Sequence, residues 1–201
     1  MKTARLLLLA LCGLALVTTT RATTVIPPTF DQLVGQAELI FQGTVTGVKS
    51  EWIGEGGQRR IVSFVTFKVD DTLKGNPGET YTVRMLGGTV DDTTMEVTDS
   101  PKFKVGDRDI LFVENNGTQF IPLVGIMHGR FRVQKDPQTG ADLIMDNHGH
   151  AVSDVAELGK DANAVLTGGG HSQADDASHG PALRSSDFKA AVRAKLGASV
   201  K

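Results

Sequence analysis

The segment IVSFVTFKV, residues 61–69, constrains the fold more than any other part of the chain. Its residues Ile61, Val65 and Phe67 recur at spacings of two or four, which places them on one face of an extended strand. Glycine, proline and asparagine separate further apolar segments of this kind, at 80–86, 110–113, 119–125, 129–135 and 141–147. So many short strands with so little helix favour an all-β barrel or sandwich that is closed on itself.

The start of this expected domain changes from helical to strand spacing. Thr29 is placed to cap a short helix over residues 30–37, whose apolar residues recur at spacings of three and four. Over residues 39–52 the spacing becomes two, interrupted by Gly43 and Gly47. We expect one long strand that bends at a glycine, with the helix covering an open end of the barrel. Two ordinary strands separated by a glycine turn are the alternative.

The expected core combines apolar residues of this helix and of the strands. We expect the following side chains to be largely buried: Phe30, Leu33, Phe41, Val65, Phe67, Val83, Leu111 and Phe131. In the last hairpin, where DPQTG forms the turn, Arg130 and Arg132 share the face opposite Phe131 and Val133.

Two connections are less regular. Asn116 and Gly117 tolerate the backbone conformation of a tight hairpin, which predicts a strand over residues 119–125. With Thr118 the same residues also match the N-glycosylation sequon, which is the alternative interpretation. Residues 87–100 show only a brief alternation, and we expect an ordered loop or an edge strand there.

Residues 1–22 have the pattern of a secretory signal peptide. Basic residues precede an apolar run from Leu6 to Val17, and small or polar residues follow it up to Ala22. That run is well short of the roughly 20 residues that span a bilayer. A lipoprotein signal at Cys12 is disfavoured because the large Leu11 precedes it. We therefore expect cleavage near Ala22, a secreted or periplasmic protein, and a mature chain without cysteine.

The C-terminal part changes in composition. We expect a β-barrel domain over residues 23–160 and a flexible linker over 161–185, disordered from about 165 to 184. An amphipathic helix at 186–201 is expected to be only loosely attached, because its apolar stripe is narrow. The helix is expected to dock either on the barrel or on a partner. Its positive residues Lys189, Arg193 and Lys195 favour docking on the acidic barrel.

The charge of the chain excludes one class of partner. The formal charge of the whole chain is −2, and loss of Lys2, Arg5 and Arg21 with the signal peptide changes it to −5. A mildly acidic surface repels phosphate backbones, so we do not expect nucleic acid to bind. Beyond the signal peptide no apolar run is long enough for a membrane span, and we expect a monomer.

Four motifs stand out: FDQLVGQAELIFQGTV at 30–45, FxVxxTLKG at 67–75, VRMLGG at 83–88 and PKFKVGDRDILF at 101–112. Together they resemble an uncharacterised group of exported bacterial β-domains, found alone or beside secreted metalloproteases. The layout is also similar to the netrin-like, OB-type barrel of tissue inhibitors of metalloproteinases, which implies a small closed or partly closed OB-like β-barrel. Those inhibitors present an N-terminal cysteine to the catalytic zinc, whereas the expected mature start here is Thr23. The resemblance therefore implies a fold and not that inhibitory mechanism.

No catalytic signature stands out in the sequence. It contains no GxSxG or HExxH motif, and the expected mature chain has no cysteine nucleophile. We therefore expect a non-enzymatic exported module that binds a protein or polymer outside the cytoplasm, with no catalytic, cofactor-binding or metal residue assigned. The alternative is a metal-dependent hydrolase in which His128, His148 and His150 gather around an ion, since His148 and His150 lie on one side of an extended chain.

Overall fold

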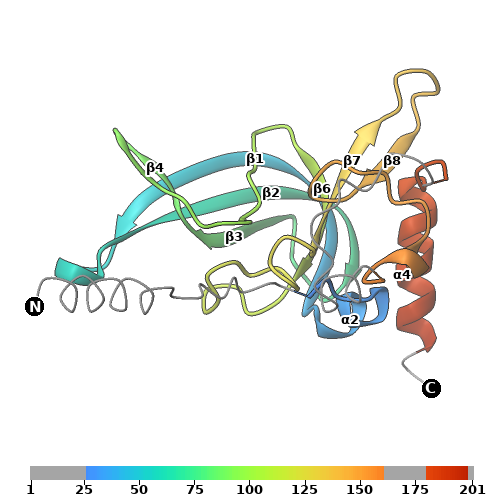
Figure 1. Ribbon diagram of the computed structural model, residues 1–201, viewed down its shortest axis with the longest axis horizontal. Helices are drawn as coiled ribbons and strands as arrows, with labels where there is room; N and C mark the ends of the chain where they lie inside the picture. The colour runs from blue at the N-terminus through green and yellow to red at the C-terminus, as the bar shows by residue number, and fades with distance from the viewer. Residues whose placement is uncertain (1–25, 161–179, 199–201) are drawn as a thin grey trace, which may run out of the picture.

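The structure is a computed structural model that describes residues 26–160 and 180–198, and it is mainly β (Figure 1). Its helices and strands are α2 (Phe30–Gln36), β1 (Leu39–Ile53), β2 (Arg60–Lys74), β3 (Thr80–Leu86), β4 (Gly88–Val90), β5 (Thr93–Met95), β6 (Arg108–Val113), β7 (Arg130–Lys135), β8 (Asp142–Met145) and α4 (Ser185–Ala198). Two short 3-10 turns, η1 (Gly56–Gln58) and η2 (Val155–Glu157), complete the described elements.

Six of the strands form one antiparallel sheet in the order β3-β2-β1-β6-β7-β8, and β4 and β5 form a separate ribbon. Within the described residues the end strands β3 and β8 do not pair, so hydrogen bonding does not close this sheet into a barrel. β1 and β2 each have 15 residues and β6 has 6, so the far half of β1 and β2 extends from the body as a long arm (Figure 1). The mainly β fold is thus confirmed, whereas a closed barrel is not observed.

β1 is a single bent strand, as the sequence predicts. Its pairing with β2 shifts register between Ile40 and Phe41, between Gln42 and Gly43, and between Val45 and Gly47. Each irregularity increases the local bend and twist. A side chain at Gly43 would lie 2.8 Å from the backbone oxygen of Lys68, so only glycine fits there without a shift. The alternative of two strands separated by a turn is wrong.

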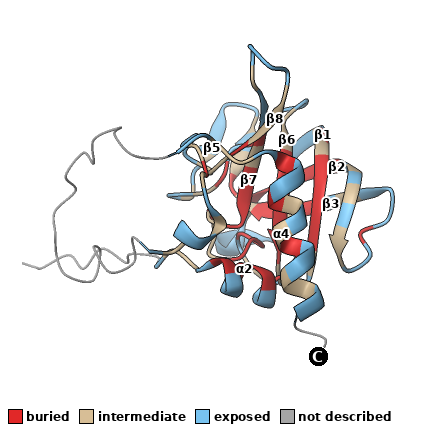
Figure 2. Ribbon diagram, turned by 90° about the vertical axis from the view of Figure 1, so that its right-hand side faces the viewer, coloured by how far each residue is buried: buried red, intermediate tan, exposed pale blue. Residues whose placement is uncertain are grey.

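The sheet is covered on both faces, and each face carries its own hydrophobic core. One core lies under α2 and α4, which cross the sheet on the same side (Figure 2), and includes Phe30, Leu33, Ile40, Ile110, Phe112, Phe131, Ile144, Phe188 and Val192. The other lies under the connections that follow β5 and β6, and includes Phe41, Val45, Val65, Phe67, Val83, Phe103, Leu111, Val113 and Leu123. All eight side chains predicted to be buried are at most 9% exposed, which confirms the predicted core.

α2 is fixed at both of its ends. Thr29 and Gln32 form a reciprocal capping box at the N-terminus, which satisfies backbone N–H groups that the helix leaves free. At the other end the Lys74 ammonium donates hydrogen bonds to the carbonyls of Val34 and Gly35 at 2.9 and 3.3 Å. The helix packs on one face of the sheet through the buried Phe30 and Leu33. Its expected role as the cover of a barrel end stays a prediction.

α4 is an integral part of the first core. Phe188 and Val192 are completely buried, and the Phe188 ring lies 4.8 Å from that of Phe131 and 6.1 Å from that of Phe30. The prediction of a loosely attached helix is therefore wrong, and the protein itself provides the resting surface. A narrow apolar stripe is sufficient because its side chains Phe188 and Val192 insert into the hydrophobic core on this face of the sheet.

The segment before α4 is partly ordered. Residues 161–179 of the expected linker lie outside the described residues. Leu183, which falls in the range predicted to be disordered, donates a backbone hydrogen bond to Val152 and accepts one from Ile144, at 2.8 and 2.9 Å. This part of the prediction is wrong because the backbone of Leu183 extends the sheet beyond β8.

Ion pairs hold the polar side of α4 to the body. Lys189 and Arg193 both bind the Asp71 carboxylate at 2.8 Å, and Lys195 binds Asp31 at 2.6 Å. The positive side chains thus face acids of the same chain, as their charge predicts. Burial alone raises the pKa of Asp71, but hydrogen bonds and charges from Lys189 and Arg193 outweigh it and lower the pKa below its usual value.

We expect Asp71→Asn to reduce the free energy of unfolding by about 1 kcal/mol at neutral pH. Because the folded-state pKa of Asp71 is lowered, its contribution is present above the unfolded pKa of about 3.9 and is lost as the pH falls through the folded pKa. Urea denaturation of both proteins at pH 7 and pH 3 checks this. An equal difference at both pH values contradicts it.

The chain after β6 does not form the predicted strand over residues 119–125. Asn115 and Gly117 have positive φ angles of 50° and 95°, but beyond them only Leu123 bridges to Val113. The Asn116 side chain instead accepts a hydrogen bond from the Arg84 amide and donates one to the Thr82 carbonyl. These bonds tie the loop to the edge of β3, which disfavours the glycosylation alternative.

Candidate functional site

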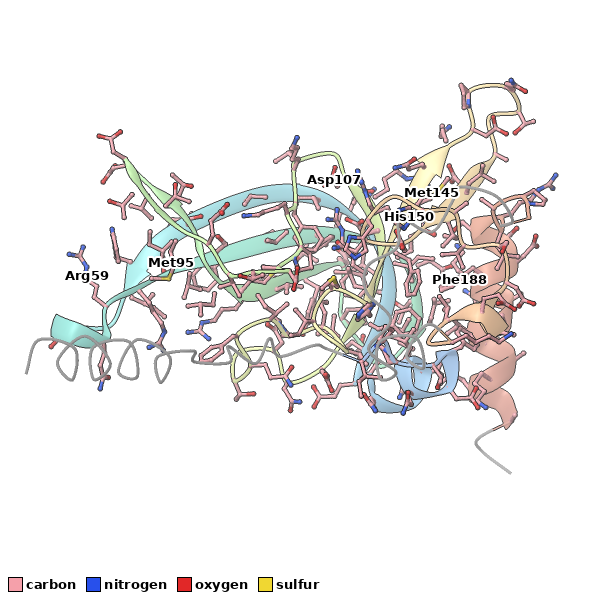
Figure 3. All side chains as sticks on the ribbon, viewed as in Figure 1. Arg59, Met95, Asp107, Met145, His150 and Phe188 are labelled. Atoms are coloured by element: carbon pink, nitrogen blue, oxygen red, sulfur yellow. The ribbon has the colours of Figure 1, made fainter. Side chains whose placement is uncertain are left out.

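A hollow of about 320 Å³ lies against the arm formed by β1, β2 and β3, under the β4–β5 ribbon. We call it the ribbon hollow. In Figure 3 the labelled Met95 marks its outer wall, and the segment that leads to Asp107 runs back toward the body. Its lining residues are Val48, Ser50, Ser63, Val65, Met85, Leu86, Gly87, Gly88, Thr89, Thr94, Met95, Glu96, Val97, Ser100, Pro101, Lys102 and Phe103. Its volume is at the small end of the range typical of ligand pockets.

Two consecutive glycines build the roof of this hollow. Gly87 and Gly88 have φ angles of 97° and 136°, a region that side chains rarely adopt. They turn the chain from the end of β3 across the face of the arm, where the Gly87 amide donates to the Ile61 carbonyl at 2.9 Å. A side chain at Gly88 would collide with the hydroxyls of Ser50 and Ser63. The glycine pair therefore determines both the direction and the height of the β4–β5 ribbon.

The polar groups of the floor are satisfied by each other. The Ser50 and Ser63 hydroxyl oxygens lie 2.8 Å apart, and Ser63 donates to the Gly87 carbonyl at 2.7 Å. The hydrogen bonds of Ser50 and Ser63 in the described structure go to each other, to the Gly87 carbonyl and to no carboxylate, imidazole or amine that would activate either hydroxyl as a nucleophile. These hydroxyls fix the geometry of the hollow.

The remaining walls are mostly apolar. Val65, Met85 and Phe103 are buried at the base, whereas Val48 is 43% exposed at the rim. Glu96 and Lys102 form an exposed ion pair at 2.9 Å on the opposite side. A hydrogen bond and charge from Lys102 lower the pKa of Glu96. Such walls would accept an apolar group that also presents polar atoms to the threonines, Glu96 and Lys102.

A buried arginine holds one wall in place. Arg130 is nearly inaccessible and binds Asp109 at 2.8 Å, Asp107 at 3.0 Å and the Lys102 carbonyl at 2.6 Å. Its guanidinium also lies 4.1 Å from the centre of the Phe103 ring, a cation–π contact. Burial raises the pKa of Asp109, and the Arg130 charge opposes this. Arg130 thus positions the wall without lining the hollow.

The histidines of the hydrolase hypothesis lie elsewhere, near the β7–β8 hairpin (His150 in Figure 3). The His148 and His150 rings are stacked 6.0 Å apart, and His150 Nδ1 lies 3.2 Å from Asp146. Burial lowers the pKa of His128, and the His148 charge acts in the same direction. Within residues 26–160 and 180–198, no three histidine, cysteine or acidic side chains gather in an arrangement that would hold a metal ion.

A second hollow of about 520 Å³ lies at the N-terminus of α4, lined by Gln42, Ala141, Asp142, Arg184, Ser185, Ser186, Lys189 and Arg193. Three of the four cations in or beside it form ion pairs. Arg108 makes a bidentate pair with Asp142 at 2.7 Å, and Lys189 and Arg193 share Asp71. Because these side chains are already paired, we assign no anion-binding role to this hollow, and the ribbon hollow is the candidate site.

Sequence reasoning did not find the ribbon hollow. The signal was present in the adjacent Gly87 and Gly88, because two glycines directly after a strand indicate a sharp change of direction over a crowded surface. Its walls come from residues up to 55 positions apart (Val48 to Phe103), and that spacing has no pattern along the chain.

Comparisons with known proteins identify no relative. No protein-family model, no curated protein and no solved structure matches the chain. The fold and the site therefore define only a mainly β protein with a small apolar hollow on an extended arm. Among the described residues, no helix is both long and apolar enough to cross a membrane.

Proposed function

We propose that this protein is a non-enzymatic, exported binding module whose ribbon hollow receives an apolar side chain of an extracytoplasmic partner protein. The observation that carries the proposal is the lining itself. Apolar side chains make up about half of its lining, its Ser50 and Ser63 hydroxyls are already hydrogen-bonded, and Val48 leaves an apolar rim open to solvent. A hollow of this kind binds by excluding water.

The ionisable groups of the lining do not favour catalysis. Glu96 and Lys102 are the ionisable lining residues, and they pair with each other in the open. A general acid or base works best when its pKa lies near the working pH. The pKa of Glu96 is lowered, which moves this carboxyl away from that range.

We also propose that the curled sheet is a half-open, OB-like barrel related to the netrin-like layout, and that its partner takes part in extracellular proteolysis. The register shifts that bend β1 support the barrel-like curl. The association with proteolysis depends on the sequence resemblance alone. Export depends on residues 1–22, which lie outside the described residues.

The test is capture of a partner by immobilised mature protein from culture medium or periplasm. We expect Val48→Asp to reduce recovery of that partner at least tenfold, because a charge at the rim disfavours entry of an apolar group. Val105→Asp is the matched control, since Val105 is also an exposed valine, at 68%, but does not line the hollow. Equal recovery with both variants, at unchanged melting temperatures, overturns the proposal.

The metal-dependent hydrolase with His128, His148 and His150 stays the second hypothesis from sequence. A stoichiometric metal retained in purified protein would favour it. Loss of that metal in His148→Ala would assign it to this group, whereas a metal that persists in the variant excludes the assignment.

A further inference from the structure

The outer edge of β1 changes character halfway along the strand. β1 pairs with β2 from Ile40 to Ile53, but it pairs with β6 only from Leu39 to Thr44. Val45 makes the last bonds on that side, to Asp107 and Gly106 at 2.8 and 2.9 Å. From Thr46 to Ile53, no backbone in the described part of the chain bonds to this edge. These eight residues correspond to about 27 Å of open strand.

The two end strands of the same sheet, β3 and β8, differ from β1 because other segments of the chain bond to their outer edges. On β3, Leu86 donates to the Phe120 carbonyl at 2.7 Å, and Asn116 covers the backbone nearby. On β8, Leu183 bonds to Ile144 and Ala151 bridges to Met145. Proteins commonly cover such edges because an open edge pairs with other chains. The open edge of β1 is thus an exception within its own sheet.

The sequence along the open edge is complementary to itself. When two copies of Val48-Lys49-Ser50-Glu51-Trp52 lie antiparallel with Ser50 opposite Ser50, each Lys49 faces Glu51 of the other copy. Each Val48 then faces Trp52 of the other copy. Opposite charges and aromatic–aliphatic pairs are favourable directly across antiparallel strands. Val48 is 43% exposed, and the side chains of Lys49 and Glu51 are 77% and 43% exposed, so all three are accessible for such pairing. Within one copy Lys49 and Glu51 pair with each other at 2.9 Å, and in the dimer each exchanges this exposed partner for the same group of the other copy.

Neighbouring registers lack this complementarity. A shift that centres the pair on Lys49 places the two Lys49 ammonium groups opposite each other, and one that centres it on Glu51 does the same with two carboxylates. Intermediate registers place side chains on the wrong face of a shared sheet, because the side-chain period of a strand is two. Charge therefore favours the register centred on Ser50 over these neighbouring registers.

We propose that a second copy of this chain pairs with the open edge of β1, antiparallel and centred on Ser50, to form a twofold-symmetric dimer with one continuous sheet. The same patch on both copies forms the interface, as such symmetry requires. Val48 and Ser50 also line the ribbon hollow, so the dimer brings Trp52 of the second copy to its rim. The inference does not depend on the proposed function, since it uses the edge and its charges alone.

Sedimentation velocity over about 1–200 µM protein, a range suited to weak dimers, tests the proposal. We expect concentration-dependent dimerisation of the wild type. Lys49→Glu or Glu51→Lys creates two like-charge pairs per dimer and raises the dissociation constant at least about tenfold. The double variant Lys49→Glu/Glu51→Lys restores opposite charges, and we expect its dissociation constant to return to within about threefold of the wild-type value.

Lys68→Glu is the control. Lys68 is also an exposed lysine, but it lies on the neighbouring strand β2, opposite Thr44 of β1, and therefore away from the open edge. It leaves the dimer unchanged. Hydrogen exchange locates the interface: amides of residues 46–53 become protected as the concentration rises. A wild type that is monomeric throughout, a dimer unaffected by both single reversals, or a double variant that stays dissociated overturns the proposal.

Discussion

Phe188→Ala lowers the free energy of unfolding by about 3–5 kcal/mol, the range typical of a large aromatic removed from a packed core. Phe188 is completely buried, and its ring contacts those of Phe30, Phe112 and Phe131 at centroid distances of 4.8–6.3 Å. Because three aromatic rings surround the space that the substitution leaves, we expect the site to collapse only partly. The loss is measured by urea denaturation with intrinsic fluorescence and circular dichroism.

Ala194→Ser on the exposed side of the same helix is the control, and it changes the stability by less than about 0.5 kcal/mol. Truncation after Lys160 removes the whole helix and has at least the effect of Phe188→Ala. A truncated protein that melts at the wild-type temperature would show that α4 adds nothing to the core.

Arg130→Met reduces the stability by about 3–5 kcal/mol at neutral pH, because it leaves the buried Asp109 carboxylate without its partner. The Asp109 side chain is completely inaccessible and that of Arg130 is 4% exposed. Adding Asp109→Asn removes the uncompensated charge, and we expect the double variant to recover at least half of the loss. No recovery in the double variant would assign the loss to packing against Phe103 instead.

The pH dependence of the Arg130→Met variant gives a second measurement. Burial holds the folded-state pKa of Asp109 above its ordinary value, and loss of the Arg130 charge raises it further. A raised folded-state pKa stabilises the fold at pH values below the unfolded pKa, and this contribution is lost as the pH rises through the folded pKa. The deficit relative to wild type should therefore shrink as the pH is lowered toward about 4.

The parts of the fold that local spacing specifies could be predicted from the sequence. The alternation at Ile61, Val65 and Phe67 places them correctly in β2, and Thr29 caps α2 as its position predicts. Gly43 lies at a register shift in β1 because a side chain there would meet the neighbouring backbone. Period, capping and close backbone approach are local properties, so a short window of sequence contains them.

The predictions that proved wrong concern features that depend on contacts between distant segments of the chain. The apolar stripe of α4 indicates that a surface is needed, but not that Phe112 and Phe131 provide it. Residues 119–125 alternate well enough for a strand, yet Phe120 bonds to β3 while Val124 bonds to β6, so no single ladder forms. Arg130 was expected on a polar face, and its burial is explained by Asp109, 21 positions away, together with Asp107 and the Lys102 carbonyl. The residues that line the ribbon hollow likewise come from distant positions in the sequence.

The place of α4 in the chain, after all strands of the sheet, has a consequence for folding. The chain is synthesised from its N-terminus onward, so β1, β6 and β7 are available before Phe188 and Val192. Until α4 docks, the face of the sheet that carries Phe112 and Phe131 lacks the cover that these two side chains provide. Apolar surface exposed in this way is prone to bind chaperones and to aggregate. We therefore expect a chain interrupted before α4 to keep part of this face exposed and to be more sensitive to proteolysis than the full chain.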